Sequence, residues 1–347
     1  MNFSELNDSI QPLNESAVSA SQKKWDEVAK PLSSLGKLET VISQMAGIFQ
    51  TADVHADKKA VIVFCADNGV LVNGVTSSAG KITAVMSEFI TRGRSSVSRM
   101  AQIASADVIT VDMGIFHPIE TEGILNRRIA GGTADFTKEP AMTPEQAAQA
   151  IQTGISLVQE CKEKGYSLIA TGEMGVGNTS TSSAAAAVLT GRGVWEVTGR
   201  GVGISDEALL HKMQVIQQGV QSRKPDPGDA FDVLCKLGGF DIAGMTGAFI
   251  GGALSRLPIV IDGFISAVSA LIAVKLCPKA KDFLLPSHVS AEPAGRLILD
   301  ALGLEPLITA GMHLGEGTGA VCLFPLIDMA LSVYHTACTF SDIQYGA

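Results

Sequence analysis

Five short apolar runs, each ending in glycine and polar residues, constrain the fold of this chain more than any other feature. They cover residues 60–66, 108–111, 167–171, 258–261 and 283–285. The runs are continuously apolar, as expected of strands that are buried on both faces of a sheet. Helical patterns lie between them, at residues 79–103, 143–164, 179–190, 206–222, 243–255 and 264–275. This alternation predicts an α/β fold with a mainly parallel sheet and helices on both faces.

Polar residues stand where these runs end, namely Asp67, Asp112, Glu173, Asp262 and Ser287. In open parallel sheets, ligands bind in the crevice at the carboxyl ends of the strands. We therefore expect these side chains to lie along one ligand-binding edge.

The composition suits a large buried core, with 46% hydrophobic and 18% charged residues. A net charge of −9 argues against a nucleic-acid partner, which needs a basic surface. The cysteines are scattered without a CxxC pair, which favours reduced thiols and a cytoplasmic location. No secretory signal is visible. The most apolar run, residues 263–274, is too short to span a bilayer, so we expect no membrane contact.

One carboxylate, Glu316, lies in a glycine-rich turn at residues 311–320, between two apolar segments. Glycines allow close backbone approach, so a ligand can reach such a turn. A carboxylate among apolar neighbours is a candidate general base, because desolvation raises its pKa toward neutrality. A helix cap or a solvated turn residue is the structural alternative.

A second turn, at residues 172–181, follows a predicted strand and opens a helix. Backbone N–H groups at a helix start form an anion site, and Asn178 or Thr179 is a candidate cap. The spacing matches neither a dinucleotide fingerprint nor a P-loop. A plain strand–turn–helix junction is the alternative, but it does not explain the acidic Glu173.

A third glycine-rich segment, residues 199–207, leads into a helix that carries Lys212. Lys212 is a candidate phosphate countercharge, and a solvated lysine after a cap at Ser205 or Asp206 is the alternative. His313 and Glu316 form an H-x-x-E pair, but the surrounding glycines argue against a helical metal site. We therefore predict no metal.

Together these segments resemble one family along nearly the whole chain. The shared motifs are KPLSSLGKLE at residues 30–39, ADNGV at 66–70, VDMG at 111–114, GTADF at 132–136, PAMT at 140–143, GEMGVGNT at 172–179, TGRG at 198–201, LGLEPL at 302–307 and LGEGTG at 314–319. They resemble the nicotinate-nucleotide–dimethylbenzimidazole phosphoribosyltransferases of cobamide assembly.

The resemblance implies transfer of phosphoribose from nicotinate mononucleotide to a lower-ligand base, without cofactor or metal. It makes Glu316 the general base and places Glu173 near the reacting ribose. It also implies a donor site for the phosphate, ribose and nicotinate, formed by Gly175, Gly177, Asn178, Thr179, Gly201, Gly203, Lys212, Ser290 and Gly315.

The fold implied by the resemblance is a Rossmann-like sheet with a small helical domain built from both chain ends. We expect residues 1–35 and 320–347 to form that small domain and residues 36–319 to form the large catalytic one. The resemblance also implies a dimer, formed either by two copies of this chain or with a paralogous subunit.

The implied acceptor pocket contains Ser77, Ser78, Val85, Met86, Met174 and Leu314. Here the chain departs from the family, because Val85 replaces the glutamine expected to meet a benzimidazole nitrogen, and Ser77-Ser78 replaces an aromatic-proline pair. The departures fit a family branch that activates phenol or p-cresol, although a retained benzimidazole acceptor stays open.

A non-catalytic homologous subunit is the main rival hypothesis, but Glu316 and the phosphate turn are intact. A nucleotide-binding oxidoreductase is a weaker one, because the dinucleotide fingerprint is missing.

Overall fold

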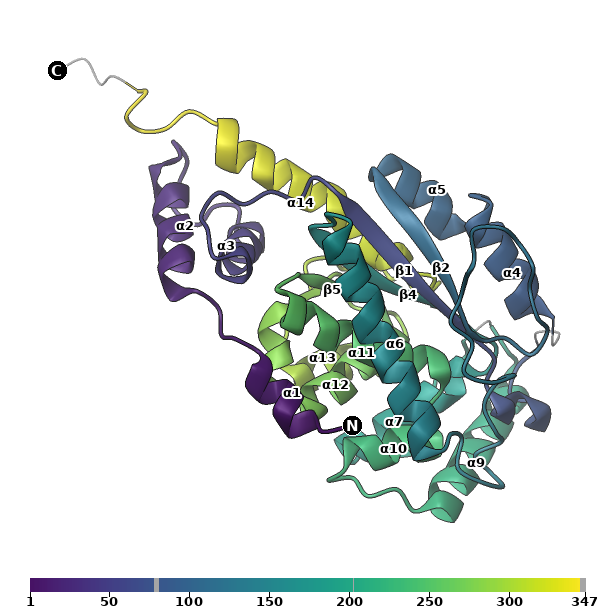
Figure 1. Ribbon diagram of the computed structural model, residues 1–347. Helices are drawn as coiled ribbons and strands as arrows, with labels where there is room; N and C mark the ends of the chain where they lie inside the picture. Colours follow the sequence, from purple (N-terminus) through teal and green to yellow (C-terminus); the bar gives the residue numbers. More distant parts are fainter. Residues whose placement is uncertain (78–80, 202, 344–347) are drawn as a thin grey trace.

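A six-stranded parallel sheet forms the centre of the computed structural model, which describes residues 1–77, 81–201 and 203–343 (Figure 1). The strand order is β3-β2-β1-β4-β5-β6. Their bounds are β1 Lys59–Ala66, β2 Ala106–Gly114, β3 Leu125–Asn126, β4 Leu168–Met174, β5 Ile259–Ile261 and β6 Leu284–Pro286. The five predicted strands and their parallel arrangement are confirmed, while the short strand β3 was not predicted.

The central strand β1 is buried along its whole length, and its side chains alternate between two hydrophobic cores. Ile62 and Phe64 pack into one core, with α6 (Pro144–Glu163), α7 (Asn178–Thr190), α10 (Ala230–Leu237), α11 (Phe240–Ser255) and α12 (Phe264–Leu276). Val61 and Val63 pack into the other, with α3 (Lys37–Phe49), α5 (Ser96–Ile103) and α14 (Thr318–Thr336). Helices therefore cover both faces, as predicted.

Helices α6 and α11 approach each other closely because glycines form their contact. A Cβ atom on Gly154 would lie 2.0 Å from the carbonyl oxygen of Gly244. One on Gly247 would lie 2.0 Å from the carbonyl oxygen of Ile151. The high glycine content thus serves tight backbone packing in this layer.

The N-terminal helix α3 lies beside the C-terminal helix α14, although the N-terminus itself lies away from both (Figure 1). Helix α2 (Glu15–Glu27) packs on α3, and the ring of Trp25 lies 4.9 Å from the ring of Tyr334 of α14 in a tilted arrangement. Helix α1 (Phe3–Ser9) contacts α12 instead. The predicted boundary at residue 320 falls inside α14, and residues 344–347 lie outside the described part of the chain. The division into two domains stays a prediction.

The helix predicted at residues 79–103 is instead two helices, α4 (Ile82–Thr91) and α5, and its first two residues are not described. The break follows from Gly93, whose φ is +71°, and from Ser95, which caps α5 by accepting from the Ser98 N–H. Periodicity alone could not detect this break. The helices α8 (Val194–Val197), α10 and α13 (Gly295–Leu302) and the 3-10 helices η1 (Gly69–Asn73) and η2 (Pro278–Phe283) were not predicted either.

Among the described residues, α14 alone is long and apolar enough to cross a membrane by length and composition. Half of its most apolar window, 50%, is buried within the protein, where it packs on α3, α5 and β4. These contacts are those of a core helix.

Candidate functional site

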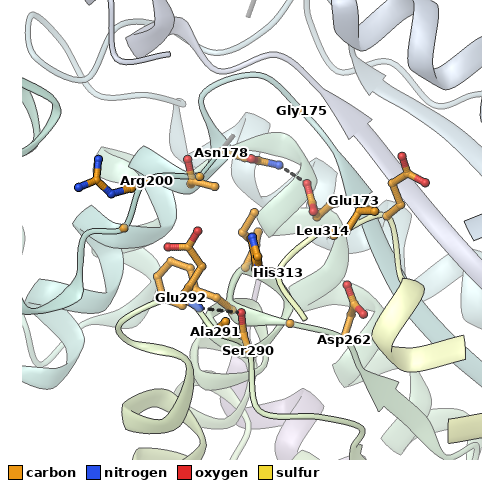
Figure 2. Close-up of a pocket in the computed structure, with 18 of the residues that line it drawn as sticks. Glu173, Gly175, Asn178, Arg200, Asp262, Ser290, Ala291, Glu292, His313 and Leu314 are labelled. Carbon is orange, nitrogen blue, oxygen red and sulfur yellow. Dashed lines mark hydrogen bonds between the residues drawn. The ribbon is translucent and has the colours of Figure 1, made fainter. Parts of the chain in front are cut away.

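A cavity of about 1180 Å³ opens at the carboxyl ends of β4, β5 and β6. Its wall includes the turn after β4, residues that follow β5 and β6, and the turn that precedes α14. Glu173 and Asp262 face this cavity from neighbouring strands (Figure 2). Asp67, Asp112 and Ser287 belong to the same edge of the sheet but are not among the lining residues. The predicted ligand edge is therefore narrower than the five strand ends suggested.

Most residues of the predicted site come together in this cavity. Those that line it are Met86, Glu173, Met174, Gly175, Gly177, Asn178, Thr179, Gly201, Gly203, Lys212, Ser290, Leu314, Gly315 and Glu316. Ser77 and Val85 are described but do not line it. Ser78 lies outside the described residues.

Glu316 is held in an unusual backbone conformation. Its φ is +61°, between Gly315 at +90° and Gly317 at +94°. The left-handed region costs a residue with a side chain about 1–2 kcal/mol, so the surroundings must enforce this turn. A side chain is excluded at the preceding position, because a Cβ on Gly315 would lie 2.4 Å from Glu173 Oε1.

The Glu316 carboxylate lies at the N-terminus of α5. Its Oε2 accepts a hydrogen bond from the Val97 N–H at 3.1 Å. Burial raises the pKa of Glu316, while the Val97 N–H and the Ser95 hydroxyl oppose that shift. The side chain is only 8% exposed, so the solvated-turn alternative is wrong. A buried carboxylate with a raised pKa suits a general base.

Asn178 does not cap its helix, contrary to one sequence prediction. Gly177, with a φ of +91°, is the N-cap residue of α7, and Asn178 and Thr179 are already helical. The Asn178 amide instead donates to Glu173 Oε2 and, at 3.1 Å, to Asp241 Oδ2 (Figure 2 shows the first bond). Asn178 thus bridges two buried carboxyl groups.

These two carboxyl groups have strongly shifted pKa values. Burial, followed by the charge of Asp241, raises the pKa of Glu173 well above its usual range. Burial also raises the pKa of Asp241 to about 6, despite hydrogen bonds to Asn178 and the backbone. Asp241 lies in the first turn of α11. Its link to Glu173 required the tertiary structure.

Lys212 is buried at 1% exposure, so the alternative of a solvated surface lysine is wrong. Its ammonium group donates to Thr179 Oγ1 and to the Gly199 carbonyl oxygen, both at 3.0 Å. Burial lowers the pKa of Lys212 to about 8, and Glu292 opposes the shift. Gly201 and Gly203 have positive φ beside it, and Ser205 caps α9 (Asp206–Arg223) as predicted. This corner combines one cation with the helix start of α7, which suits an anion.

An apolar wall, formed by Ile82 and Met86 of α4, Met100 of α5, Met174 and Leu314, also lines the cavity. Val85 lies on the same helix as Met86 but is 42% exposed and turned from the cavity. One residue along a helix rotates a side chain by about 100°, since 3.6 residues make a turn. The predicted acceptor contact of Val85 is therefore not observed. Ile82 and Met100 were missed, although Ile82 and Met86 have the spacing of one helix face.

Several polar residues that line the cavity were not among the predicted binding residues, although His313 had been considered as a metal ligand and Arg200 lies in the third glycine-rich segment. They include Arg200, His288, Glu292 and His313. Figure 2 shows Arg200 and Glu292 near Asn178, on the side of the cavity away from Asp262. The family resemblance pointed to the segment after β6 through Ser290, but not to His288 or Glu292.

The arrangement gives no support to a metal site at His313 and Glu316. Their turn is not helical, and His313 Nδ1 binds the Gly311 carbonyl oxygen. Within the described ranges, the one group with metal-like spacing is Asp53, His55 and His335, at the surface. There the two ring nitrogens of His335 face Lys24 Nζ and the Val54 carbonyl oxygen.

Comparison with known proteins relates the chain to one enzyme family. Residues 10–344 match the family model DBI_PRT, described as phosphoribosyltransferase. A protein of Ruminiclostridium cellulolyticum named nicotinate-nucleotide–dimethylbenzimidazole phosphoribosyltransferase is 44% identical, over 99% of this chain and 98% of that one. A protein of the same name from Acetivibrio thermocellus is 46% identical, over 92% of each chain. The crystal structure of CobT from Thermus thermophilus superimposes with a TM-score of 0.89 at 34% identity, over 94% of this chain and 98% of that chain.

Proposed function

Because the chain belongs to the nicotinate-nucleotide–dimethylbenzimidazole phosphoribosyltransferase family, we propose that it transfers phosphoribose from nicotinate mononucleotide to an aromatic lower-ligand base. The observation that carries the proposal is that Glu316 and the Lys212 corner share one cavity. The chain is thus a phosphoribosyltransferase, and its substrates and the roles of its residues are our proposal.

In this proposal the 5′-phosphate of the donor binds the N-terminus of α7, near the buried Lys212. The ammonium group keeps its two hydrogen bonds to Thr179 and Gly199 and has a third N–H for a phosphate oxygen. The positive end of the α7 dipole adds to the attraction. Gly201 and Gly203 let the backbone approach the phosphate, while Ser290 and Gly315 flank the ribose and nicotinate.

The reaction breaks the bond between C1′ and the nicotinate nitrogen, which leaves with the bonding electrons. A nitrogen or oxygen of the acceptor forms the new bond to C1′ from the opposite face. Glu316 takes the proton that the acceptor loses. Glu173 stabilises positive charge that develops on the ribose, as carboxylates do at other anomeric centres.

We propose dimethylbenzimidazole, or a base of similar shape, as the first acceptor candidate. Relatives with 44–46% identity bear that substrate in their names. The change to Val85 offers little support for a different acceptor, because this side chain faces away from the cavity. A phenol or p-cresol is the second candidate. The apolar wall suits an acceptor that needs a single polar contact, here with Glu316.

A competition assay tests both candidates. The protein is supplied with nicotinate mononucleotide and equal amounts of dimethylbenzimidazole, adenine and p-cresol, and the ribosyl phosphates are separated by mass. We expect the benzimidazole product to dominate. A dominant phenolic product would replace the first candidate with the second, and the absence of every product would refute the proposal for this chain alone.

The alternative role, a non-catalytic or semi-catalytic subunit of a heterodimer, predicts a damaged base or phosphate corner. Glu316 and Lys212 are both present and buried, which favours a catalytic chain. Purification from native cells with mass analysis of the complex would distinguish a dimer of identical chains from a dimer with a paralogue. A cytoplasmic location is part of the same proposal.

A further inference from the structure

The turn that carries Glu316 needs support from outside its own segment. Three successive residues with positive φ precede α14, and the N-cap position of α14 is Gly317, which has no side chain to cap the helix. The first N–H groups of a helix have no intrahelical partner. The support must therefore come from another element.

Asp262 supplies it from the end of β5. Its Oδ2 accepts from the Gly317 N–H at 3.2 Å, and its Oδ1 accepts from the Ala320 N–H at 2.9 Å. These two groups belong to the N-cap and the third residue of α14. Asp262 thus performs, from a distant part of the sequence, the role that a capping side chain normally performs locally.

The packing of the sheet brings this carboxylate to the turn. Strand β5 pairs with β4, and a Cβ on Gly172 of β4 would lie 2.3 Å from the Glu316 carbonyl oxygen. Glu316 therefore rests on β4, directly beside the strand end that carries Asp262. Gly319 has no side chain that would crowd the Asp262 carboxylate. A Cβ there would lie 3.0 Å from Asp262 Oδ1.

We propose that Asp262 is a positioning residue, which fixes the strained turn and so aims the Glu316 carboxylate at the acceptor. Both of its carboxylate oxygens bind the backbone around Glu316, and it is buried with 4% exposure. This inference rests on the proposed role of Glu316 as base. A small displacement of a catalytic group can lower a rate about 10²-fold.

The test is a double-mutant cycle between Asp262→Asn and Glu316→Gln. The asparagine retains the size of the side chain but replaces one acceptor oxygen with an amide donor, so one of the two backbone bonds is lost. We expect kcat to fall at least about tenfold with less than a threefold change in the donor KM. In the Glu316→Gln background, Asp262→Asn should lower turnover less than about twofold, because there is no base left to aim.

Asp112→Asn is the matched control. Asp112 is also a buried aspartate at a strand end, and its Oδ1 accepts from the Gly114 and Ile115 N–H groups at 2.9 Å each. It does not line the cavity. We expect it to change kcat less than about twofold in protein that stays folded.

Several outcomes would overturn the inference. An Asp262→Asn protein with the kcat of the unaltered chain would do so, and so would an equal loss of turnover in both backgrounds, which indicates direct contact with substrate. If Asp262→Asn does not fold, Asp262→Ser enters the same cycle. Amide exchange in the unaltered protein gives an independent reading: Gly317 and Ala320 should be protected, and fast exchange at both would contradict the capping bonds.

The same experiment separates this inference from the proposed function. If the unaltered chain transfers no phosphoribose to any acceptor, the proposed function fails whatever Asp262 does. If Glu316→Gln leaves turnover unchanged, the base assignment falls and the inference falls with it. If only the Asp262 variants behave as the unaltered chain does, the proposed function stands and the inference alone is wrong.

Discussion

The two sides of the cavity are built in different ways. In the part proposed to bind the phosphate, glycines, a helix start and Lys212 form a polar corner whose shape depends mainly on backbone conformation. In the part proposed to bind the acceptor, side chains from α4, α5 and two turns form an apolar wall. A backbone-built site is encoded in contiguous motifs, whereas a side-chain wall depends on how separate helices are rotated. This difference explains why contiguous motifs pointed to the residues of the polar corner, whereas Val85 was wrongly included in the wall and Ile82 and Met100 were missed.

The largest effect should come from the residue that both sides share. We expect Glu316→Gln to lower turnover by about 10²-fold or more, because the amide cannot take the acceptor proton. The donor affinity should stay unchanged, since the phosphate corner is intact. Steady-state kinetics and calorimetric titration with nicotinate mononucleotide measure the two quantities, and normal turnover would refute the base assignment.

A change on the phosphate side should affect the donor alone. We expect Lys212→Gln to raise the donor KM about 10- to 100-fold, the worth of a charged hydrogen bond, with a smaller change in kcat. An equal rise in the donor KM and the acceptor KM would contradict the separate roles of the two sides.

Donor binding should also depend on pH through Lys212. Its pKa is lowered to about 8, so donor binding by the free protein should weaken as the pH rises through that value and the ammonium group loses its charge. The Gln variant should lack this alkaline limb. The acid limb has the opposite sign, because turnover should rise as Glu316 loses its proton, above the usual pKa of 4.5. A profile of kcat/KM from pH 5 to pH 9 measures both limbs.

A change on the acceptor side should be smaller and confined to the acceptor. We expect Met86→Ala to raise the acceptor KM about 3- to 10-fold through lost apolar contact, with an unchanged donor KM. Val85→Ala is the matched control on the same helix, and less than a twofold effect is expected because Val85 faces outward. A larger effect at Val85 than at Met86 would reverse our assignment of the helix face.

The smallest effect concerns stability. The native pKa of Glu173 is raised, so the native state holds a proton that the unfolded chain releases, and stability decreases as the pH rises above the unfolded value. The Glu173→Gln variant should not show this decrease in stability, because glutamine does not titrate. We expect its melting temperature to exceed that of the unaltered chain by about 2 °C or more at pH 8, and by less at pH 5. Calorimetry at both pH values measures this, and an equal difference at both would contradict the assigned shift.

Much of the fold followed from local pattern. The five apolar runs predicted the strands, because burial on both faces requires continuous apolar sequence. The break between α4 and α5 was missed because only the apolar periodicity was considered, although Gly93 and Ser95 are residues typical of a helix end and a helix start. The short strand β3 carries too little apolar sequence to be recognised.

The sequence by itself determined the parallel sheet, the glycine turns and the place of Glu173 at a strand end, because each of these depends on neighbouring residues, and the family resemblance added Glu316 and Lys212. Only the tertiary structure decided that Lys212 is buried, that Asn178 joins Glu173 to Asp241, that Val85 faces away, and that Asp262 caps α14. The physical reason is that burial, helix rotation and capping across strands arise from contacts between segments far apart in the chain. Such contacts cannot be predicted from a local sequence pattern.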